Sequence, residues 1–259
     1  AMKEGRYLYC VANVKEKTSL GNIGIEDSEV YTVPFQDIAA VVHCCDVHPY
    51  ETSEEEKAKE WILAHLYTID EAMKRFGTPL PFRFDTIIKG GDDEVAGWLR
   101  KEYRRLKGAL DEVREKAEYG VQIFWDRDLV AEKVRERRGM EKLERGIEER
   151  PGMAYMLKRK MEKRLKDELT VEAEERRKEF YERISACVAK IKVEKAKAES
   201  KSLKGKEMLL NLSCLADRAQ VEELGKVLDG INAMRGIEVH FTGPWPPFNL
   251  AGGGEHEAQ

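Results

Sequence analysis

The sequence contains no long hydrophobic run. Its most apolar stretch, 38–42, is far shorter than the roughly 18 apolar residues that a membrane-spanning helix needs. The five cysteines are odd in number and include no C-x-x-C pair, which favours reduced thiols over a disulfide framework. The first residues also lack the apolar core of a signal peptide. Together these absences predict a cytoplasmic protein without a membrane segment.

Neither sign of charge dominates the chain. Lys and Arg number 45 and Asp and Glu 49, so the net charge is −4 although 36% of the residues are charged. A general nucleic-acid-binding surface needs a positive excess, and we therefore expect no nucleic-acid partner. The hydrophobic fraction of 42% in 259 residues is sufficient for one large or two modest domains.

Motifs of common catalytic sites are also missing. The sequence has no G-x-G-x-x-G, Walker loop, G-x-S-x-G or H-E-x-x-H, and its five histidines are scattered. His65 lies inside a predicted helix and is interpreted as a half-buried helix residue rather than a general base. We expect no enzyme activity and no cofactor; an enzyme on a ferredoxin-like sheet would rest on fold analogy alone.

One short cluster raises the question of a metal site. His43, Cys44, Cys45 and His48 fall within six residues at the end of a predicted strand. Neighbouring strand residues point to opposite faces, whereas structural zinc sites use spaced pairs. We therefore predict no metal here, with a zinc site as the alternative.

The first 125 residues mix strands and helices without regular alternation. Strands are predicted at 6–12, 29–33, 38–43, 78–88 and 118–125, and helices at 54–76 and 92–116. This pattern favours an α+β fold over a doubly wound sheet. The first helix has apolar residues at three- and four-residue steps, predicted to form one buried face: Trp61, Ile62, Ala64, Leu66, Ile69, Ala72, Met73 and Phe76.

The excess charge is concentrated between residues 126 and 202. Glu and Lys/Arg interleave there, and a stripe of apolar residues every four positions predicts one long solvent-facing helix over about 151–199. Strands at 206–215 and 236–241 and a helix at 216–231 follow. The series resembles a modified ferredoxin-like unit. We therefore predict an N-terminal α+β domain over 1–116, a C-terminal ferredoxin-like domain over 117–242, and an extended Pro-rich tail over 243–259.

Two short segments are candidates for partner binding or domain docking. Arg83 lies between Phe82 and Phe84 on a predicted strand, where a guanidinium must find an acceptor or face solvent. A structural ion pair with a helix carboxylate is the first interpretation and a partner contact the second. The tail offers a stiff apolar segment that packs on its own protein or on a partner: Trp245, Pro246, Pro247 and Phe248.

Six short segments stand out in order along the chain: 7–9 (YLY), 37–42 (DIAAVV), 80–84 (LPFRF), 118–126 (EYGVQIFWD), 152–157 (GMAYML) and 242–248 (TGPWPPF). Together they resemble segments of the gas vesicle protein F/L family (GvpF/GvpL), and the resemblance extends from Tyr7 to Leu250. Asp85 stands where the family often has glycine, and Phe248 stands where a tyrosine commonly follows the two prolines.

This resemblance implies two α+β domains and a noncatalytic accessory protein of gas vesicles, located in the cytoplasm and at the vesicle. It also implies that the protein contacts the small hydrophobic shell protein GvpA and assists nucleation and assembly of the shell. An alternative is a scaffold that links several gas vesicle accessory proteins through the charged helix.

Overall fold

The computed structural model describes residues 4–137, 145, 151–195, 202–203 and 206–251. The chain divides into two compact units. The first unit extends to Tyr119 and includes the described residues from Gly243 onward, and the second unit is Gly120–Thr242. The division lies a few residues after the boundary predicted near 116, and it groups residues 243–251 with the first unit instead of leaving them as a separate tail.

The first unit is built on an antiparallel sheet with strand order β2-β3-β4-β1-β5, in which β6 also pairs with β1. The central pair, β1 and β4, runs in register from Glu4 opposite Asp46 to Ala12 opposite Ala39, with an irregularity between Leu8 and Cys10. The strands are β1 (Glu4–Ala12), β2 (Ser19–Asn22), β3 (Glu29–Phe35), β4 (Ile38–Asp46), β5 (Leu80–Pro81) and β6 (Ile87–Lys89). A 3-10 turn, η1 (Ile25–Asp27), links β2 and β3.

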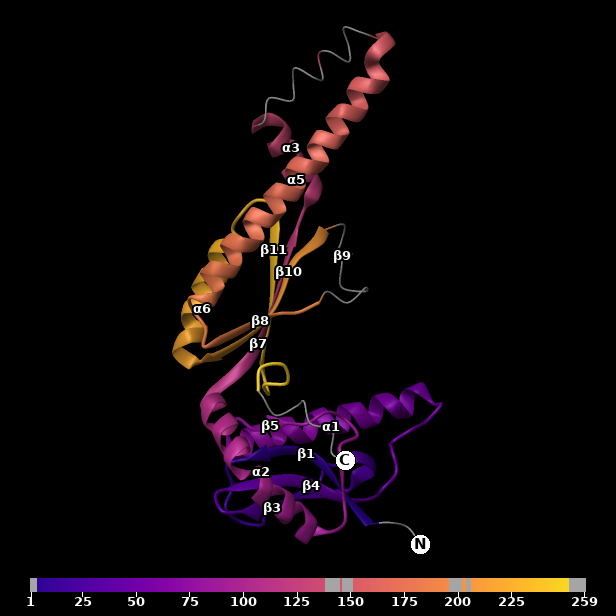
Figure 1. Cartoon of the computed structure of the whole chain (residues 1–259), viewed down its shortest axis with the longest axis vertical. Coiled ribbons are helices and arrows are strands. Elements are labelled where there is room, and N and C mark those ends of the chain that lie inside the picture. The colour runs from indigo at the N-terminus through magenta and orange to yellow at the C-terminus, as the bar shows by residue number, and fades with distance from the viewer. Residues whose placement is uncertain (1–3, 138–144, 146–150, 196–201, 204–205, 252–259) are drawn as a thin grey trace. The chain divides into compact units, whose positions relative to one another are not determined.

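Two helices cover the sheet of the first unit, α1 (Glu55–Phe76) and α2 (Asp92–Val113). Neighbouring side chains of β1 point to opposite faces: Tyr7 reaches His65 of α1, whereas Arg6 reaches Asp92 of α2. The helices therefore pack on opposite faces (Figure 1). Because both faces are covered, β1 and β4 are buried over most of their length, which explains their nearly continuous apolar sequence.

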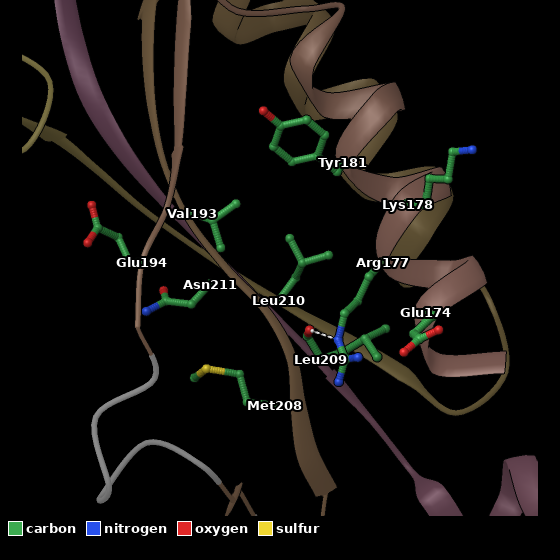
Figure 2. Close-up of a pocket in the computed structure, with 10 residues that line it drawn as sticks. All are labelled: Glu174, Arg177, Lys178, Tyr181, Val193, Glu194, Met208, Leu209, Leu210 and Asn211. Atoms are coloured by element: carbon green, nitrogen blue, oxygen red, sulfur yellow. Dashed lines mark hydrogen bonds between the residues drawn. The ribbon is translucent and has the colours of Figure 1, made fainter. Parts of the chain in front are cut away.

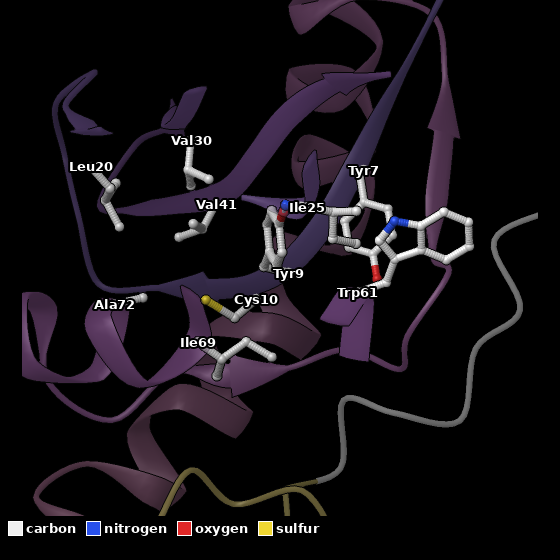
Figure 3. Packing of buried hydrophobic residues seen from close by; sticks show 10 residues of the cluster. All are labelled: Tyr7, Tyr9, Cys10, Leu20, Ile25, Val30, Val41, Trp61, Ile69 and Ala72. Atoms are coloured by element: carbon white, nitrogen blue, oxygen red, sulfur yellow. The ribbon is translucent and has the colours of Figure 1, made fainter. Parts of the chain in front are cut away.

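The core beneath α1 is aromatic and polar as well as aliphatic. Figure 3 shows Tyr9 among aliphatic side chains of this cluster, and Trp61 of α1 packs edge-on against Tyr50 with ring centroids 5.2 Å apart. The cluster comprises Tyr7, Tyr9, Cys10, Leu20, Ile25, Val30, Val41, Trp61, Ile69 and Ala72. The buried face of α1 is thus narrower than predicted, since Ile62 and Leu66 are 45% and 41% exposed.

An ion-pair centre joins α2 to β1. Asp92 Oδ1 accepts hydrogen bonds from Arg6 Nε at 2.8 Å and Tyr31 Oη at 2.7 Å, while Oδ2 lies 2.8 Å from Lys17 Nζ. Burial acts to raise the pKa of Asp92, but the hydrogen bonds from Lys17, Tyr31 and Arg6 outweigh it and lower the pKa to about 2. This carboxylate is therefore charged at neutral pH and fixes the first turn of α2 to the sheet.

The second unit contains a sheet of order β11-β7-β10-β8, with β9 paired to β10 at the same edge as β8. In chain order, strands and helices read β7, α3, α5, β8, β9, β10, α6 and β11; apart from α3 and the short β9, this is the β-α-β-β-α-β series of the ferredoxin-like motif. The bounds are β7 (Lys116–Trp125), α3 (Arg127–Arg137), η2 (Pro151–Met153), α5 (Ala154–Ser185), β8 (Lys190–Val193), β9 (Ser202–Leu203), β10 (Lys206–Asp217), α6 (Arg218–Asn232) and β11 (Ile237–Trp245).

The long charged helix is shorter than predicted. It ends at Ser185, and the following residues turn and form β8 against Leu212–Leu215 of β10. Ile191 falls within the predicted range 151–199, where a four-residue step connects it to earlier apolar positions. The alternation of Lys and β-branched residues in Lys190–Val193 is equally compatible with a strand, and pairing with β10 satisfies its backbone. Residues 196–199 of the predicted helix lie outside the described residues.

The helix α5 buries only one narrow side. Leu169, Ala173, Phe180 and Ile184 are buried, and charged residues occupy most of the remaining surface. The solvent-facing helix predicted over about 151–199 is therefore found over Ala154–Ser185.

Candidate functional site

A first chain of hydrogen bonds crosses the core between β1 and α1. The Asp85 amide donates to Tyr7 Oη at 2.9 Å, and this hydroxyl lies 2.9 Å from His65 Nδ1. On the other side of the ring, His65 Nε2 lies 3.2 Å from the Phe82 carbonyl, which can only accept. His65 is therefore a neutral imidazole protonated on Nε2, with Tyr7 as the donor to Nδ1. It is only 3% exposed, so the half-buried position expected for it was wrong.

A second chain of the same design lies beside the first. The Ile25 amide donates to Tyr9 Oη at 3.0 Å, Tyr9 Oη lies 2.7 Å from His43 Nδ1, and His43 Nε2 lies 3.0 Å from Tyr50 Oη. His43 is fully buried and stacks on Tyr7 with ring centroids 5.1 Å apart. The two histidines thus link the sheet to α1 and to the segment after β4.

Burial sets the protonation of both histidines. It lowers the pKa of His43 and of His65 to about 4, although the bond to the Phe82 carbonyl acts in the opposite direction on His65. Burial also raises the pKa of Tyr7 and of Tyr9. Near neutral pH all four rings are uncharged, and each histidine nitrogen faces a hydrogen-bond partner, so the geometry fits a structural network rather than a general base.

The residues around His43 do not converge on a metal. His43 points into the core, while Cys44, the next residue of β4, is exposed and lies 3.4 Å from Tyr31 Oη. Across the described part of the chain, no group of three or more His, Cys, Asp or Glu side chains could hold an ion. The two faces of β4 separate His43 and Cys45, which lie on the side of the core, from the exposed Cys44.

The segment around Arg83 is an interrupted strand rather than the continuous one predicted. Leu80 and Pro81 pair with β1 as β5, and the pairing resumes at Ile87 as β6. Phe82 is buried and packs edge-on against Trp98 at 5.7 Å. Arg83 is exposed, and among the described residues its guanidinium has no ion pair. The structural ion pair expected for Arg83 is therefore absent from this part of the chain.

Asp85 lies in the turn within this interruption. Its φ of 66° is in the left-handed region that glycine prefers and that Asp tolerates better than most residues. Its Oδ1 accepts from the Tyr50 amide at 3.0 Å, and Phe84 beside it packs edge-on against Tyr7, Tyr50 and His65. Asp85 thereby fits a glycine-like turn and adds a hydrogen bond of its own.

The segment after β11 is anchored in the first unit. The buried carboxylate of Glu118 accepts two hydrogen bonds from Asn249, one from its backbone amide at 2.8 Å and one from its side-chain Nδ2 at 2.5 Å. Pro246 and Pro247 are buried. Trp245 is 52% exposed and Phe248 39% exposed. The two prolines therefore belong to the packed structure, while both aromatic rings retain accessible surface.

Four large apolar side chains of α1 are exposed. Ile62, Leu63, Leu66 and Tyr67 are each between 41% and 64% exposed, and their spacing puts them on one side of the helix. The opposite side holds Trp61, His65, Thr68, Ile69 and Ala72 against the sheet. The exposed side formed by Ile62, Leu63, Leu66 and Tyr67 is called the α1 apolar face below.

A groove of about 560 Å³ lies in the second unit between α5 and the edge of the sheet (Figure 2). Tyr181 of α5 and Val193 of β8 stand on opposite sides of it, and Leu210 of β10 lies between them. These side chains make the groove largely apolar.

The fold and these surfaces can be compared with known proteins. The model of the family described as gas vesicle synthesis protein GvpL/GvpF matches residues 5–251. The chain belongs to the GvpL/GvpF family.

The similar proteins include both gas vesicle L proteins and gas vesicle F proteins. The chain is 32% identical to gas vesicle protein L1 of Halobacterium salinarum, over 96% of this chain and 91% of that protein. It is 29% identical to gas vesicle protein L of Haloferax mediterranei, over 96% and 88%, and 23% identical to gas vesicle protein F1 of Halobacterium salinarum, over 96% and 93%.

Solved structures share the fold. The crystal structure of GvpF from Anabaena sp. PCC7120 aligns with a TM-score of 0.74 at 16% identity, covering 96% of this chain and 98% of that one. GvpF from Microcystis aeruginosa aligns with a TM-score of 0.66 at 15% identity, covering 95% and 98%. This GvpL/GvpF-family chain is therefore an α+β protein with two antiparallel sheets, and membership implies a role in gas vesicle formation. None of its described helices is long and apolar enough to cross a membrane.

Sequence reasoning missed two features of this gas vesicle family member. The α1 apolar face was hidden because Ile62 and Leu66 fit the buried stripe, although the neighbouring Leu63 and Tyr67 signalled a second apolar side. The paired Tyr–His chains left no local signal, since Tyr7 and His65 are 58 residues apart.

Proposed function

We propose that the protein is a noncatalytic gas vesicle assembly factor that binds the hydrophobic shell protein GvpA and assists nucleation and growth of the shell. Family membership supports the process, and the α1 apolar face is the observation that carries the proposed contact. Contiguous exposed apolar residues on a soluble surface commonly mark protein-binding sites. A shell protein with apolar faces is a matching partner, because association would remove both apolar surfaces from water.

Charged residues frame this face on α1 itself. On the N-terminal side of the α1 apolar face, Lys59 pairs with Glu55 and Glu56. On its C-terminal side, Lys74 pairs with Asp70 and Glu71. A charged border keeps an exposed apolar patch soluble until the partner covers it.

The candidate residues predicted from the sequence divide by accessibility. Phe82, Phe84, Pro246 and Pro247 are mostly within the packed first unit, which suits domain docking. Arg83, Trp245 and Phe248 retain exposed surface, and they remain proposed secondary contacts to the partner.

The test is co-purification of the full chain with the shell protein. Leu63→Lys combined with Leu66→Lys should weaken binding by about tenfold or more, because two charges would have to be buried in an apolar contact. Val171→Lys, at a 44% exposed position of α5, is the matched control and should bind like the wild type. Equal unfolding midpoints of the three proteins would show that folding is unaffected.

Two outcomes would contradict the proposal. If the wild-type chain never retains the shell protein and its deletion leaves vesicle formation unchanged, the assembly function is wrong. If the chain retains several accessory proteins but no shell protein, the scaffold alternative replaces it; the densely charged exposed surface of α5 is the feature that favours that function.

A further inference from the structure

The α1 apolar face is symmetric about its own midpoint. Its members form two adjacent pairs, one helical turn apart: Ile62 with Leu63, and Leu66 with Tyr67. Two copies of α1 can therefore pack antiparallel about a two-fold axis that passes through this midpoint. Leu63 of one copy then lies level with Leu66 of the second copy, and Ile62 lies level with Tyr67 of the second copy.

The charged residues on the same side of α1 have complementary signs in this arrangement. Lys59 lies level with Asp70 of the second copy, about 8 Å along the helix from the two-fold axis. Farther out, Glu55 and Glu56 come beside Lys74 of the second copy. All five side chains are accessible; that of Lys59 is 54% exposed and that of Asp70 42%. Because the symmetry repeats each contact, opposite charges would flank the apolar centre at both ends.

We propose that the α1 apolar face is an interface between two copies of this chain, which pair through antiparallel α1 helices. A two-fold contact needs a surface that is complementary to itself, and this face with its flanking charges meets that condition. The apolar centre supplies the driving force, because both copies remove large side chains from water. The charges select the direction, since parallel helices in register would set Lys59 against Lys59 and Asp70 against Asp70.

The chain ends next to the first unit do not match this face. The undescribed residues there are 1–3 (AMK) and 252–259 (GGGEHEAQ), and their sequences include one large apolar residue, Met2. A second copy instead brings four large apolar side chains at the matching spacing, together with charges of the required sign. The self-complementary pattern therefore favours a second copy as the occupant.

The small size of the contact sets its strength. About two turns of each helix would bury less than the roughly 1,200 Å² of a standard stable interface, so we expect dissociation in the micromolar range. The dimer goes beyond the proposed function and does not depend on it. A further consequence does rest on that function: the shell protein and the second copy would compete for one face, so the free protein would keep this face covered until the shell protein displaces the second copy.

Sedimentation equilibrium of the full chain between about 1 µM and about 200 µM tests the dimer. The wild type should change from monomer to dimer over this range. Leu63→Glu should raise the dissociation constant by about tenfold or more, because its carboxylate would be buried against Leu66 of the second copy. Leu63 is 64% exposed in the single chain, so folding should be intact. The matched control, Val171→Glu at a 44% exposed position of α5, should change the constant by less than about twofold.

A charge exchange tests the antiparallel direction and leaves the apolar centre untouched. Lys59→Glu alone would set a glutamate against Asp70 at both contacts, and Asp70→Lys alone would set two lysines together. Each variant by itself should therefore dimerise about tenfold more weakly than the wild type. An equimolar mixture of the two variants should recover the wild-type affinity, because every contact across the two-fold axis would then join opposite charges. A folding defect in either variant could not produce this recovery.

Three results would overturn the dimer. They are a wild type that stays monomeric at about 200 µM, a Leu63→Glu variant that dimerises as tightly as the wild type, and a mixture of the charge variants that is no tighter than either alone.

The outcomes for the dimer and for the proposed function are distinguishable. A chain that stays monomeric but retains the shell protein would overturn the dimer and leave the assembly function standing. A chain that dimerises as expected but never retains the shell protein would confirm the dimer and remove the shell contact proposed for the α1 apolar face.

Discussion

Lowering the pH from 7 to 5 should destabilise the first unit strongly, because His43 and His65 are buried as neutral rings. Burial lowers the pKa of each to about 4 in the folded protein, against 6.5 for an accessible histidine. A histidine whose pKa is lower in the folded protein than in the unfolded chain stabilises the fold at pH values above its pKa in the unfolded chain. This contribution is lost as the pH falls from about 6.5 toward 4, because the unfolded chain binds protons that the folded chain refuses.

The magnitude follows from these two pKa values. At pH 5 each histidine is almost fully protonated in the unfolded chain and mostly neutral in the folded one, which costs about 2 kcal/mol per histidine relative to pH 7. The two together reduce the free energy of unfolding by about 4 kcal/mol, a large share of the stability of an ordinary domain. The lowered pKa of Asp92, about 2, adds its own loss only below about pH 4.

Urea unfolding followed by tryptophan fluorescence at pH 7, 6 and 5 measures this effect. Trp61, Trp98 and Trp245 lie in the first unit, so the signal reports mainly on it. His65→Gln removes one titrating ring while its amide can still reach the Phe82 carbonyl, and it should roughly halve the pH dependence. His48→Gln, at an exposed position, is the control and should leave the pH dependence unchanged.

A loss of less than about 1 kcal/mol between pH 7 and pH 5 would refute the reasoning, since one buried histidine alone predicts more. An unchanged pH dependence in His65→Gln would equally refute it for that residue. Both results would mean that the rings are accessible to protons in the folded protein.

Two further predictions concern the segments that close the first unit. Asn249→Ala should lower its free energy of unfolding in urea by about 2 kcal/mol, because it removes the side-chain Nδ2 donor to the buried Glu118 carboxylate and leaves only the backbone amide donor. Phe248→Ala should cost less, and equal costs would contradict the anchoring role. Asp85→Ala should be less stable than Asp85→Gly by about 1 kcal/mol, since both lose the bond to the Tyr50 amide but only glycine accepts a φ of 66° freely. Equal urea midpoints for the two Asp85 variants would show that the left-handed conformation is not required.

Local patterns in the sequence were sufficient for most of the secondary structure. Strand periodicity marked the central strands of both sheets, and helix periodicity marked α1, α2 and α6, because such patterns depend on residues close together in the chain. The ordered segments that resemble the GvpL/GvpF family also predicted that the chain belongs to it. The β8 strand was missed because Lys190–Val193 is short and follows a helix whose spacing it continues.

The candidate site was predicted less well, because accessibility depends on distant residues. Arg83 was expected in an ion pair, yet the chain turns at Asp85 and leaves it exposed. The sequence could not separate the two apolar sides of α1, since both carry large apolar residues at helical spacing.

The sequence by itself determined the α+β class, the concentration of charge in the second half and the family, because these depend on composition, local period and ordered short motifs. Only the tertiary structure decided that His43 and His65 are buried and neutral, that the segment after β11 belongs to the first unit, and that one apolar side of α1 is exposed. Each of these depends on contacts between residues far apart in the chain, such as Glu118 and Asn249, 131 residues apart, and such contacts leave no periodic trace in the sequence.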